Sequence, residues 1–199
     1  MMNVMIDIES LAIAQPLEPN VKICQIGLAA FDEGFEVTDK LCVNIDTNAQ
    51  INRIKDKSTM SWWANQPKEV IKSVFTNQIH PEEACDVIIN FLEKFGRNKF
   101  RFWSNHILFD IPAFESFLQD FSNGRGENLY RYNQIEDYAT LIDYMIMKLG
   151  VTKKTFFEEI NDSFYDEYPD IKSHNAIDDC IYQIYVLKFI DRALFGDAN

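Results

Sequence analysis

The chain has 199 residues, of which 47% are hydrophobic and 25% are charged, and its formal net charge is −12 at pH 7. These proportions exclude a disordered tail, a collagen-like fibre and a disulfide-dense mini-protein. The negative charge excludes non-specific attraction to polyanions. Binding of a nucleic acid would therefore need a local source of positive charge, such as a divalent cation.

The cysteines and the apolar segments indicate the compartment. Cys24, Cys42, Cys85 and Cys180 form no C-x-x-C pair and lie in apolar patterns, so we expect reduced, buried thiols and no zinc site. The first residues lack the basic start and the long apolar run of a signal peptide. The apolar stretches are too short to cross a bilayer. We therefore expect a cytoplasmic protein that does not enter a membrane.

The first part of the chain is predicted to be a β-meander. Residues 3–8 are a short apolar run, and residues 22–32 are almost continuously apolar, which favours two buried strands. A turn is predicted at residues 32–34. Apolar and polar residues then alternate over residues 35–46, as is typical of an antiparallel strand with one wet face.

Helical patterns with one further strand follow. Ser58 or Thr59 is predicted to cap a helix that contains Trp62 and Trp63 and is interrupted by Pro67. Residues 151–172 are acidic and aromatic and fit no element clearly. Ser173 is predicted to cap the last helix. The other predicted elements are a helix from Pro81 to Gly96, a strand over 99–104, a helix from Asp110, a loop over 122–128, and helices over 137–149 and about 175–194.

This order of elements predicts an α/β fold in one domain, residues 1–199. Three antiparallel strands open a mixed sheet, and helices flank it. We find no internal repeat, low-complexity tract or linker.

Two carboxylates stand out on the first strand. Residues i and i+2 of a strand share a face, so Asp7 and Glu9 are expected side by side. A hard divalent cation would relieve their repulsion. The ordinary alternative is a pair of solvated carboxylates at a strand end. Asp110 opens a helix, where a capping role would be a sufficient explanation.

A histidine and an aspartate precede and open the last helix. His174 and Asp179 are five residues apart, and a His174 in the preceding loop could bend over the site that Asp179 faces. Histidine is the side chain best suited to moving a proton near neutral pH. The alternative is a capping or surface histidine. Asp178 is the runner-up to Asp179 and is more typical of a solvated first-turn carboxylate.

In chain order these residues form three motifs: D-x-E at Asp7 and Glu9, N-x-x-x-F-D ending at Asp110, and H-x-A-x-x-D from His174 to Asp179. The sequence resembles the DEDDh (DnaQ-like) 3′–5′ exonucleases of the ribonuclease H-like superfamily. Within them it is most similar to the subgroup of phage exonuclease A enzymes and mycobacterial-type 3′–5′ exoribonucleases. The matches to that subgroup are Trp62 to Pro67, Asn133-Gln134 and Asp179-Cys180.

The resemblance implies a ribonuclease H-like fold and an exonuclease that releases 5′-mononucleotides from the 3′ end of single-stranded nucleic acid. It implies two Mg²⁺ or Mn²⁺ ions held by Asp7, Glu9, Asp110 and Asp179, with His174 as general base. Family members often form dimers, so a homodimer is a further implication. DNA is slightly favoured as substrate, and an exoribonuclease is the alternative. There are two alternatives from other classes. One is a catalytically inactive module that binds nucleic acid, and the other is a ribonuclease H-like endonuclease.

Substrate contacts are expected from residues near the motifs. One ring of the Trp62-Trp63 pair is expected to stack on a base and the other to join the core, with Trp63 slightly favoured for stacking. Ser10 and Leu11 follow the first motif, in a stretch that contacts the terminal nucleotide in related enzymes.

Gln66 and Asn105 complete the expected substrate contacts. Gln66 could reach a base or a phosphate, or cap the broken helix, and Asn105 belongs to the second motif. Basic clusters at residues 53–57, 97–101 and 153–154 could steer a phosphate backbone, but solvated surface is the favoured interpretation for each.

Overall fold

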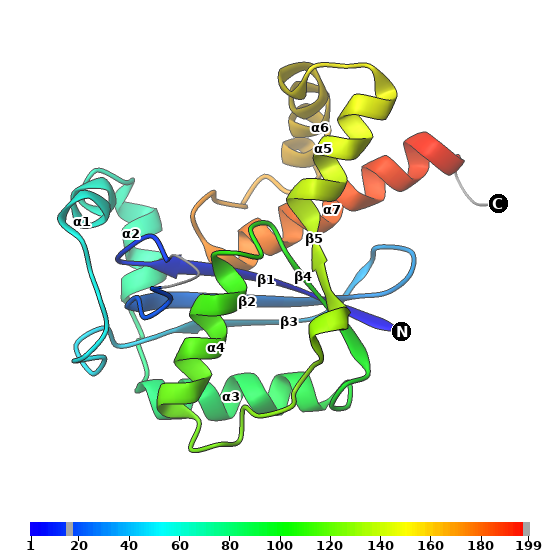
Figure 1. Ribbon diagram of the computed structural model, residues 1–199. Helices are drawn as coiled ribbons and strands as arrows, with labels where there is room; N and C mark the ends of the chain where they lie inside the picture. Colours follow the sequence, from blue (N-terminus) through cyan, green and yellow to red (C-terminus); the bar gives the residue numbers. More distant parts are fainter. Residues whose placement is uncertain (15–17, 197–199) are drawn as a thin grey trace.

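The computed structural model describes residues 1–14 and 18–196, and in this part of the chain five strands form one mixed sheet (Figure 1). The strand order is β3-β2-β1-β4-β5, with β1 in the centre. The β1–β2 and β2–β3 pairs are antiparallel, whereas β1–β4 and β4–β5 are parallel. The predicted α/β fold and its opening meander are confirmed. The strands are β1 Met2–Ser10, β2 Ile23–Phe31, β3 Val37–Asn44, β4 Phe100–Ser104 and β5 Ile135–Asp137.

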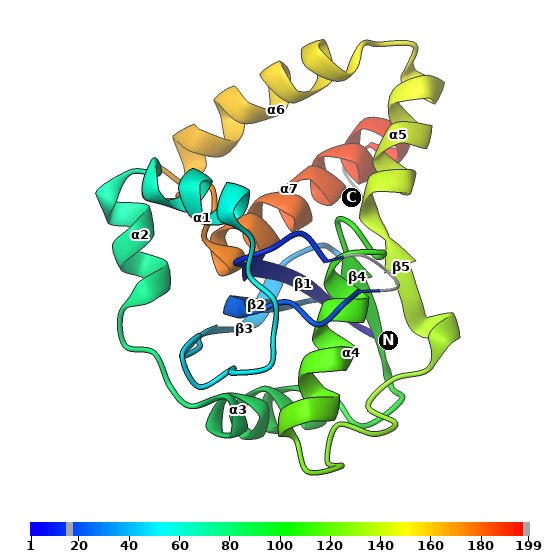
Figure 2. The ribbon, with the colours of Figure 1, turned by 60° about the vertical axis from the view of Figure 1, so that its left-hand side comes forward.

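Helices pack on both faces of this sheet, as Figures 1 and 2 show. One core cluster joins the sheet to α3 and α4, and a second joins the other face to α5, α6 and α7. Helices α1 and α2 pack beside the end of β1 and the start of β2 through a small third cluster. The helices are α1 Lys57–Ala64, α2 Lys68–Phe75, α3 Pro81–Glu93, α4 Asp110–Phe121, α5 Tyr138–Leu149, α6 Lys153–Glu167 and α7 Ala176–Phe195, with a 3₁₀ turn at Tyr132–Gln134.

The alternation of β1 decides which of its side chains meet α7. Val4, Ile6 and Ile8 enter the core on the side of α3 and α4, while Met5 packs with α7. Because side chains alternate along a strand, Asp7 and Glu9 continue the Met5 face. The two carboxylates therefore lie on the same side of the sheet as the start of α7.

Two helix starts differ from the predictions. Helix α1 is capped by Asp56, whose Oδ1 accepts the backbone N–H of Thr59 at 2.7 Å, so Ser58 and Thr59 are not the cap. Helix α7 is capped by Asn175 rather than by Ser173. In both cases the N-cap is a neighbouring aspartate or asparagine instead of the predicted serine or threonine. Aspartate and asparagine are as favourable at the N-cap as serine.

The segment that the sequence left unassigned contains helix α6. Thr152 caps it by accepting the backbone N–H of Thr155 at 3.2 Å. Phe156, Ile160 and Phe164 recur every four residues and are buried on one face. The rest of the helix is polar and acidic, and this narrow apolar stripe is all that identifies it.

Two surface predictions also need correction. Cys24, Cys85 and Cys180 are buried free thiols as expected, but Cys42 is exposed, because β3 is an edge strand. Arg53 is not solvated surface: only 5% of it is exposed. No helix in residues 1–14 and 18–196 combines the length and the apolar character needed to cross a membrane.

Candidate active site

The start of α7 approaches the sheet unusually closely opposite Asp7. Gly27 pairs with Asp7 in the β1–β2 register. A Cβ atom on Gly27 would lie 2.3 Å from the carbonyl carbon of Ala176, so only glycine permits this approach. Gln25 secures the same turn, because its Oε1 accepts the backbone N–H of Ala176 at 2.7 Å. The sheet and α7 therefore bring Asp179 to the carboxylates of β1.

Asp110 reaches the same site from α4. It is 3% exposed and stands at the first position of the helix, at the end of the loop that follows β4. Ser104, the last residue of β4, donates its hydroxyl to Asp110 Oδ2 at 2.6 Å. The helix is not capped by this carboxylate, since its N-cap is Phe109 without a side-chain bond. The capping explanation for Asp110 is therefore wrong.

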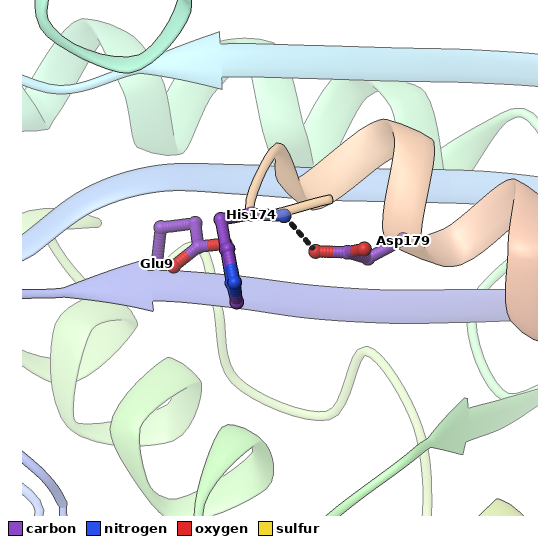
Figure 3. A group of neighbouring side chains, drawn as sticks. All are labelled: Glu9, His174 and Asp179. Atoms are coloured by element: carbon purple, nitrogen blue, oxygen red, sulfur yellow. Dashed lines mark hydrogen bonds between the residues drawn. The ribbon is translucent and has the colours of Figure 1, made fainter. Parts of the chain in front are cut away.

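His174 lies in the loop before α7 and bends back toward β1 (Figure 3). Its backbone has a φ of 64°, in the left-handed region, and its N–H donates to Asp179 Oδ2 at 3.0 Å. One ligand atom each of Glu9, His174 and Asp179 lies within 4.8 Å of the other two. The loop thus places an imidazole beside two carboxylates from different elements.

The carboxylates of the site raise one another's pKa. Burial raises the pKa of Asp7 to about 8, and the charge of Asp110 adds to this effect. Burial and the charge of Asp7 raise the pKa of Glu9 to about 9 and of Asp179 to about 8. Burial also raises the pKa of Asp110 to about 7, against the hydrogen bond from Ser104, and it lowers the pKa of His174.

No ion pair in the described part of the chain includes Asp7, Glu9, Asp110 or Asp179. The four side chains offer only oxygen ligands, which are those that Mg²⁺ and Mn²⁺ prefer. A cluster of buried carboxylates without a cation of its own is expensive to ionise. The donor set therefore fits one or more hard divalent cations.

A cleft of about 1060 Å³ opens above these residues. Helix α1 contributes Trp62 to its lining, and α6 contributes Phe157 and Tyr165. Lys153 is the one lysine or arginine among the described lining residues, and it pairs with Asp143 at 3.0 Å. The cleft is therefore acidic at the carboxylates and aromatic at the walls, with little positive charge of its own.

Four of the expected substrate contacts line this cleft, namely Ser10, Trp62, Trp63 and Asn105. Ser10 and Asn105 are among the lining residues, and the Ser10 hydroxyl donates to the Ala12 carbonyl at 2.6 Å. Trp62 is 41% exposed. Its ring meets the His174 imidazole edge to face, with the ring centroids 4.8 Å apart. These positions suit contacts to a terminal nucleotide.

Leu11 and Gln66 lie outside the cleft, and Trp63 borders it only with a buried ring. Trp63, which the sequence slightly favoured for stacking, is only 4% exposed, and its Nε1 donates to the Ser10 carbonyl at 2.9 Å. Leu11 packs against it in the small cluster at α1 and α2. Gln66 donates to the Trp62 carbonyl at 3.3 Å and closes the end of α1. The helix thus points one tryptophan inward and one outward, and Trp62 is the outward one.

The α6 wall is the part of the site that sequence reasoning missed. Phe157, Asn161 and Tyr165 all line the cleft. They recur every four residues, which is a second stripe beside the buried one and is readable once a helix is assumed. The Tyr182 hydroxyl of α7 donates to Asn161 Oδ1 at 2.7 Å and ties the two helices together.

The mixed sheet, with carboxylates converging in its cleft, places the chain in the class of ribonuclease H-like folds. Solved structures agree in fold. E. coli exonuclease I in complex with a dA16 oligonucleotide matches with a TM-score of 0.66 and 11% identity, over 97% of this chain and 41% of that chain. S. pombe Pop2p, in a Mg²⁺- and Mn²⁺-bound form, matches with a TM-score of 0.60 and 16% identity, over 98% of this chain and 84% of that chain. Cell-death related nuclease 4 (CRN-4) matches with a TM-score of 0.58 and 16% identity, over 98% of this chain and 65% of that chain.

The particular family follows from the sequence. Residues 2–190 match the family model of the 3′–5′ exoribonuclease Rv2179c-like domain, and the chain belongs to this family. The predicted membership in the DEDDh exonucleases is confirmed. No curated protein sequence gives a significant match. The chain spans 65% of CRN-4 and 41% of exonuclease I, so these likenesses concern the nuclease fold.

Proposed function

We propose that this chain is a divalent-metal-dependent 3′–5′ exonuclease that releases 5′-mononucleotides from single-stranded RNA. The observation that carries the proposal is the convergence of four carboxylates and one histidine from β1, α4 and the start of α7, without a protein cation. Elements from β1 near the start of the chain to α7 near its end contribute to this site, which supports one catalytic domain over residues 1–199.

Asp7, Glu9, Asp110 and Asp179 would hold the metal, and Pop2p is a neighbour with Mg²⁺ and Mn²⁺ bound. Two such ions would neutralise the scissile phosphate and lower the pKa of the attacking water. The negative charge of the chain is then no obstacle, because the cations reverse the local field.

His174 is the general base in this proposal. Its lowered pKa keeps the imidazole neutral near pH 7, so that a ring nitrogen can accept a proton from the attacking water. Water attacks the phosphorus, the bond to the O3′ of the preceding nucleotide breaks, and the last nucleotide leaves with a 5′-phosphate. The bond from the backbone N–H of His174 to Asp179 holds the loop in place, and the edge contact with Trp62 orients the imidazole.

The walls of the cleft support a single-stranded substrate. Trp62, Phe157 and Tyr165 are aromatic and line the cleft, and any unpaired base can stack on such rings. With a single lysine among the described lining residues, stacking and the metal site must supply most of the affinity. RNA is the first substrate to test because the family is described as exoribonuclease. DNA is the second, because exonuclease I was solved with DNA oligonucleotides.

The test is a gel assay with 5′-labelled single-stranded RNA and DNA of matched sequence, each with Mg²⁺, Mn²⁺ or EDTA. We expect a ladder that shortens from the 3′ end of RNA faster than of DNA and that EDTA abolishes. His174→Ala should slow it by about 10²–10⁴-fold, the usual contribution of a general base. His80→Ala, at a histidine outside the cleft lining, is the matched control. A faster DNA ladder would reassign the substrate, and no ladder on either strand would favour the binding-module alternative.

Two further expectations, on the oligomeric state and on the location in the cell, go with the proposal. A homodimer is supported by the exposed apolar residues Tyr144, Met147 and Val151 at the end of α5. Light scattering of the purified chain tests it, with a mass of 23.2 kDa expected for a monomer. A cytoplasmic location stays a prediction from the sequence.

A further inference from the structure

Gln183 of α7 stands apart from the other buried glutamines of this chain. The side chains of Gln25, Gln50 and Gln134 are buried, and in each one both ends of the amide bond to the protein. Gln183 is equally buried, with 4% exposed. Its Nε2 donates to Asp7 Oδ1 at 3.1 Å, but its Oε1 has no hydrogen-bond partner.

A buried amide oxygen without a partner is costly, and natural folds rarely retain one. Gln183 lies one helical turn after Asp179, and both line the cleft. Residues four apart share a helix face, so the amide belongs to the carboxylate site rather than to the core. Asn20 and Asn98 also carry a buried amide oxygen without a partner, but neither lines the cleft. At the carboxylate site, the unpaired oxygen of Gln183 is placed to accept a hydrogen bond from a donor that enters from outside the chain.

We propose that Gln183 is a positioning residue for the divalent cation. Its NH₂ group fixes the Asp7 carboxylate through Oδ1, and its carbonyl oxygen accepts a hydrogen bond from a water molecule in the hydration shell of the ion. This inference rests on the proposed metal-dependent function. Hydrogen-bond partners of metal ligands commonly orient the ligands in this way, and water bound to a cation is a strong donor.

The geometry of Asp7 agrees with this role. The bond from Gln183 is the one hydrogen bond to the Asp7 side chain in the described part of the chain, and Oδ2 remains open. Without the amide, the Asp7 carboxylate would be free to rotate among Glu9, Asp110 and Asp179. A fixed carboxylate loses less entropy when it binds an ion, so the effect should appear in metal affinity.

The experiment measures Mn²⁺ binding by electron paramagnetic resonance, together with the Tm in EDTA. Gln183→Met keeps the length of the side chain and removes both polar ends. We expect Mn²⁺ affinity to fall about 10- to 100-fold. We expect the Tm in EDTA to stay equal or rise, because a buried unsatisfied oxygen is removed.

Gln134→Met is the matched control, since Gln134 bonds to the carbonyls of Asn98 and Phe100 away from the cleft. It should lower the Tm and leave Mn²⁺ affinity unchanged. If Gln183→Met does not fold, Gln183→Asn, whose shorter amide cannot span the 3.1 Å bond, replaces it with the same expectation for Mn²⁺ affinity. Wild-type Mn²⁺ affinity in the Gln183 variants would overturn the inference and leave the nuclease standing. Absence of Mn²⁺ binding by the wild-type protein would overturn both.

Discussion

Arg53 and the four carboxylates of the cleft both bring charge into the protein interior, but their surroundings differ. The side chain of Arg53 is 1% exposed. Its Nε donates to the Val21 carbonyl at 2.7 Å, and its Nη1 donates to Asp120 at 2.5 Å and to Ser116 at 3.3 Å. The rings of Phe117 and Phe121 lie within 6 Å of the guanidinium, in cation–π contact.

The cleft carboxylates have no such compensation. Ser104, Gln183 and the N–H of His174 donate to three of them, but no lysine or arginine pairs with any of the four in the described chain. The Arg53 site therefore serves stability, since it ties the segment before α1 to α4. The carboxylate site reduces the stability of the metal-free protein and is suited to binding a cation.

The largest expected effect comes from neutralising one cleft carboxylate. Asp179→Asn should reduce turnover by about 10³-fold or more, because a metal ligand supports several kcal/mol of transition-state stabilisation. The same change should raise the Tm in EDTA, because it removes a carboxylate that the metal-free fold must either protonate or bury as a charge. Single-turnover cleavage and thermal unfolding test the two effects. Asp178→Asn is the neighbouring control and should leave turnover near wild type. A lower Tm for Asp179→Asn would contradict the comparison.

The two adjacent tryptophans divide between function and stability in the same way. Trp62→Ala should raise the KM about 10-fold with little change in stability, because it removes one stacking surface. Trp63→Ala should cost about 3–5 kcal/mol of unfolding free energy, the usual cost of emptying a buried aromatic site. Steady-state kinetics and urea unfolding separate the two. Equal losses of stability would show that Trp62 is also part of the core.

The stabilising role of the Arg53 site is tested by replacing Asp120, its ion-pair partner. Asp120→Ala leaves the buried guanidinium without its counter-ion and should cost about 2–3 kcal/mol of unfolding free energy. Asp39→Ala removes the carboxylate of an exposed pair with Lys94 and should leave the urea midpoint unchanged. Nuclease activity should survive both changes. A midpoint for Asp120→Ala that equals the one for Asp39→Ala would show that the buried pair is not stabilising.

Much of the site could be predicted because its chemistry depends on short-range spacing. The period of a strand puts Asp7 and Glu9 on one face, and the D-x-E and H-x-A-x-x-D motifs keep their spacing through local structure. The opening meander followed from the apolar runs and from the alternation after the turn at residues 32–34. These features need no knowledge of distant contacts.

What the sequence could not show depends on tertiary packing. Trp62 and Trp63 are neighbours, and only the position of α1 against α2 and Leu11 decides which ring is buried. Arg53 looked like surface because its partner Asp120 lies 67 residues away. The α6 wall was missed because its apolar stripe is narrow in an acidic segment.

The same uncompensated carboxylates predict a pH dependence of stability in the metal-free protein. Burial raises the pKa of Asp7 and Asp179 from 3.8 to about 8, and of Glu9 from 4.5 to about 9. At pH values between the lower, unfolded-state pKa and the raised, folded-state pKa, the folded state binds more protons than the unfolded state. The free energy of unfolding should therefore fall as pH rises from about 4 to about 9.

Saturating Mn²⁺ should oppose this fall, because the bound ion displaces the protons from the carboxylates. The gap between the Tm in Mn²⁺ and the Tm in EDTA should therefore widen from pH 5 to pH 8, measured by calorimetry in matched buffers. Asp179→Asn should narrow the gap, whereas Asp120→Ala should not, because Arg53 already compensates that carboxylate. A gap that is constant with pH would mean that the cleft carboxylates are already ionised without metal, and that the two sites do not differ in compensation.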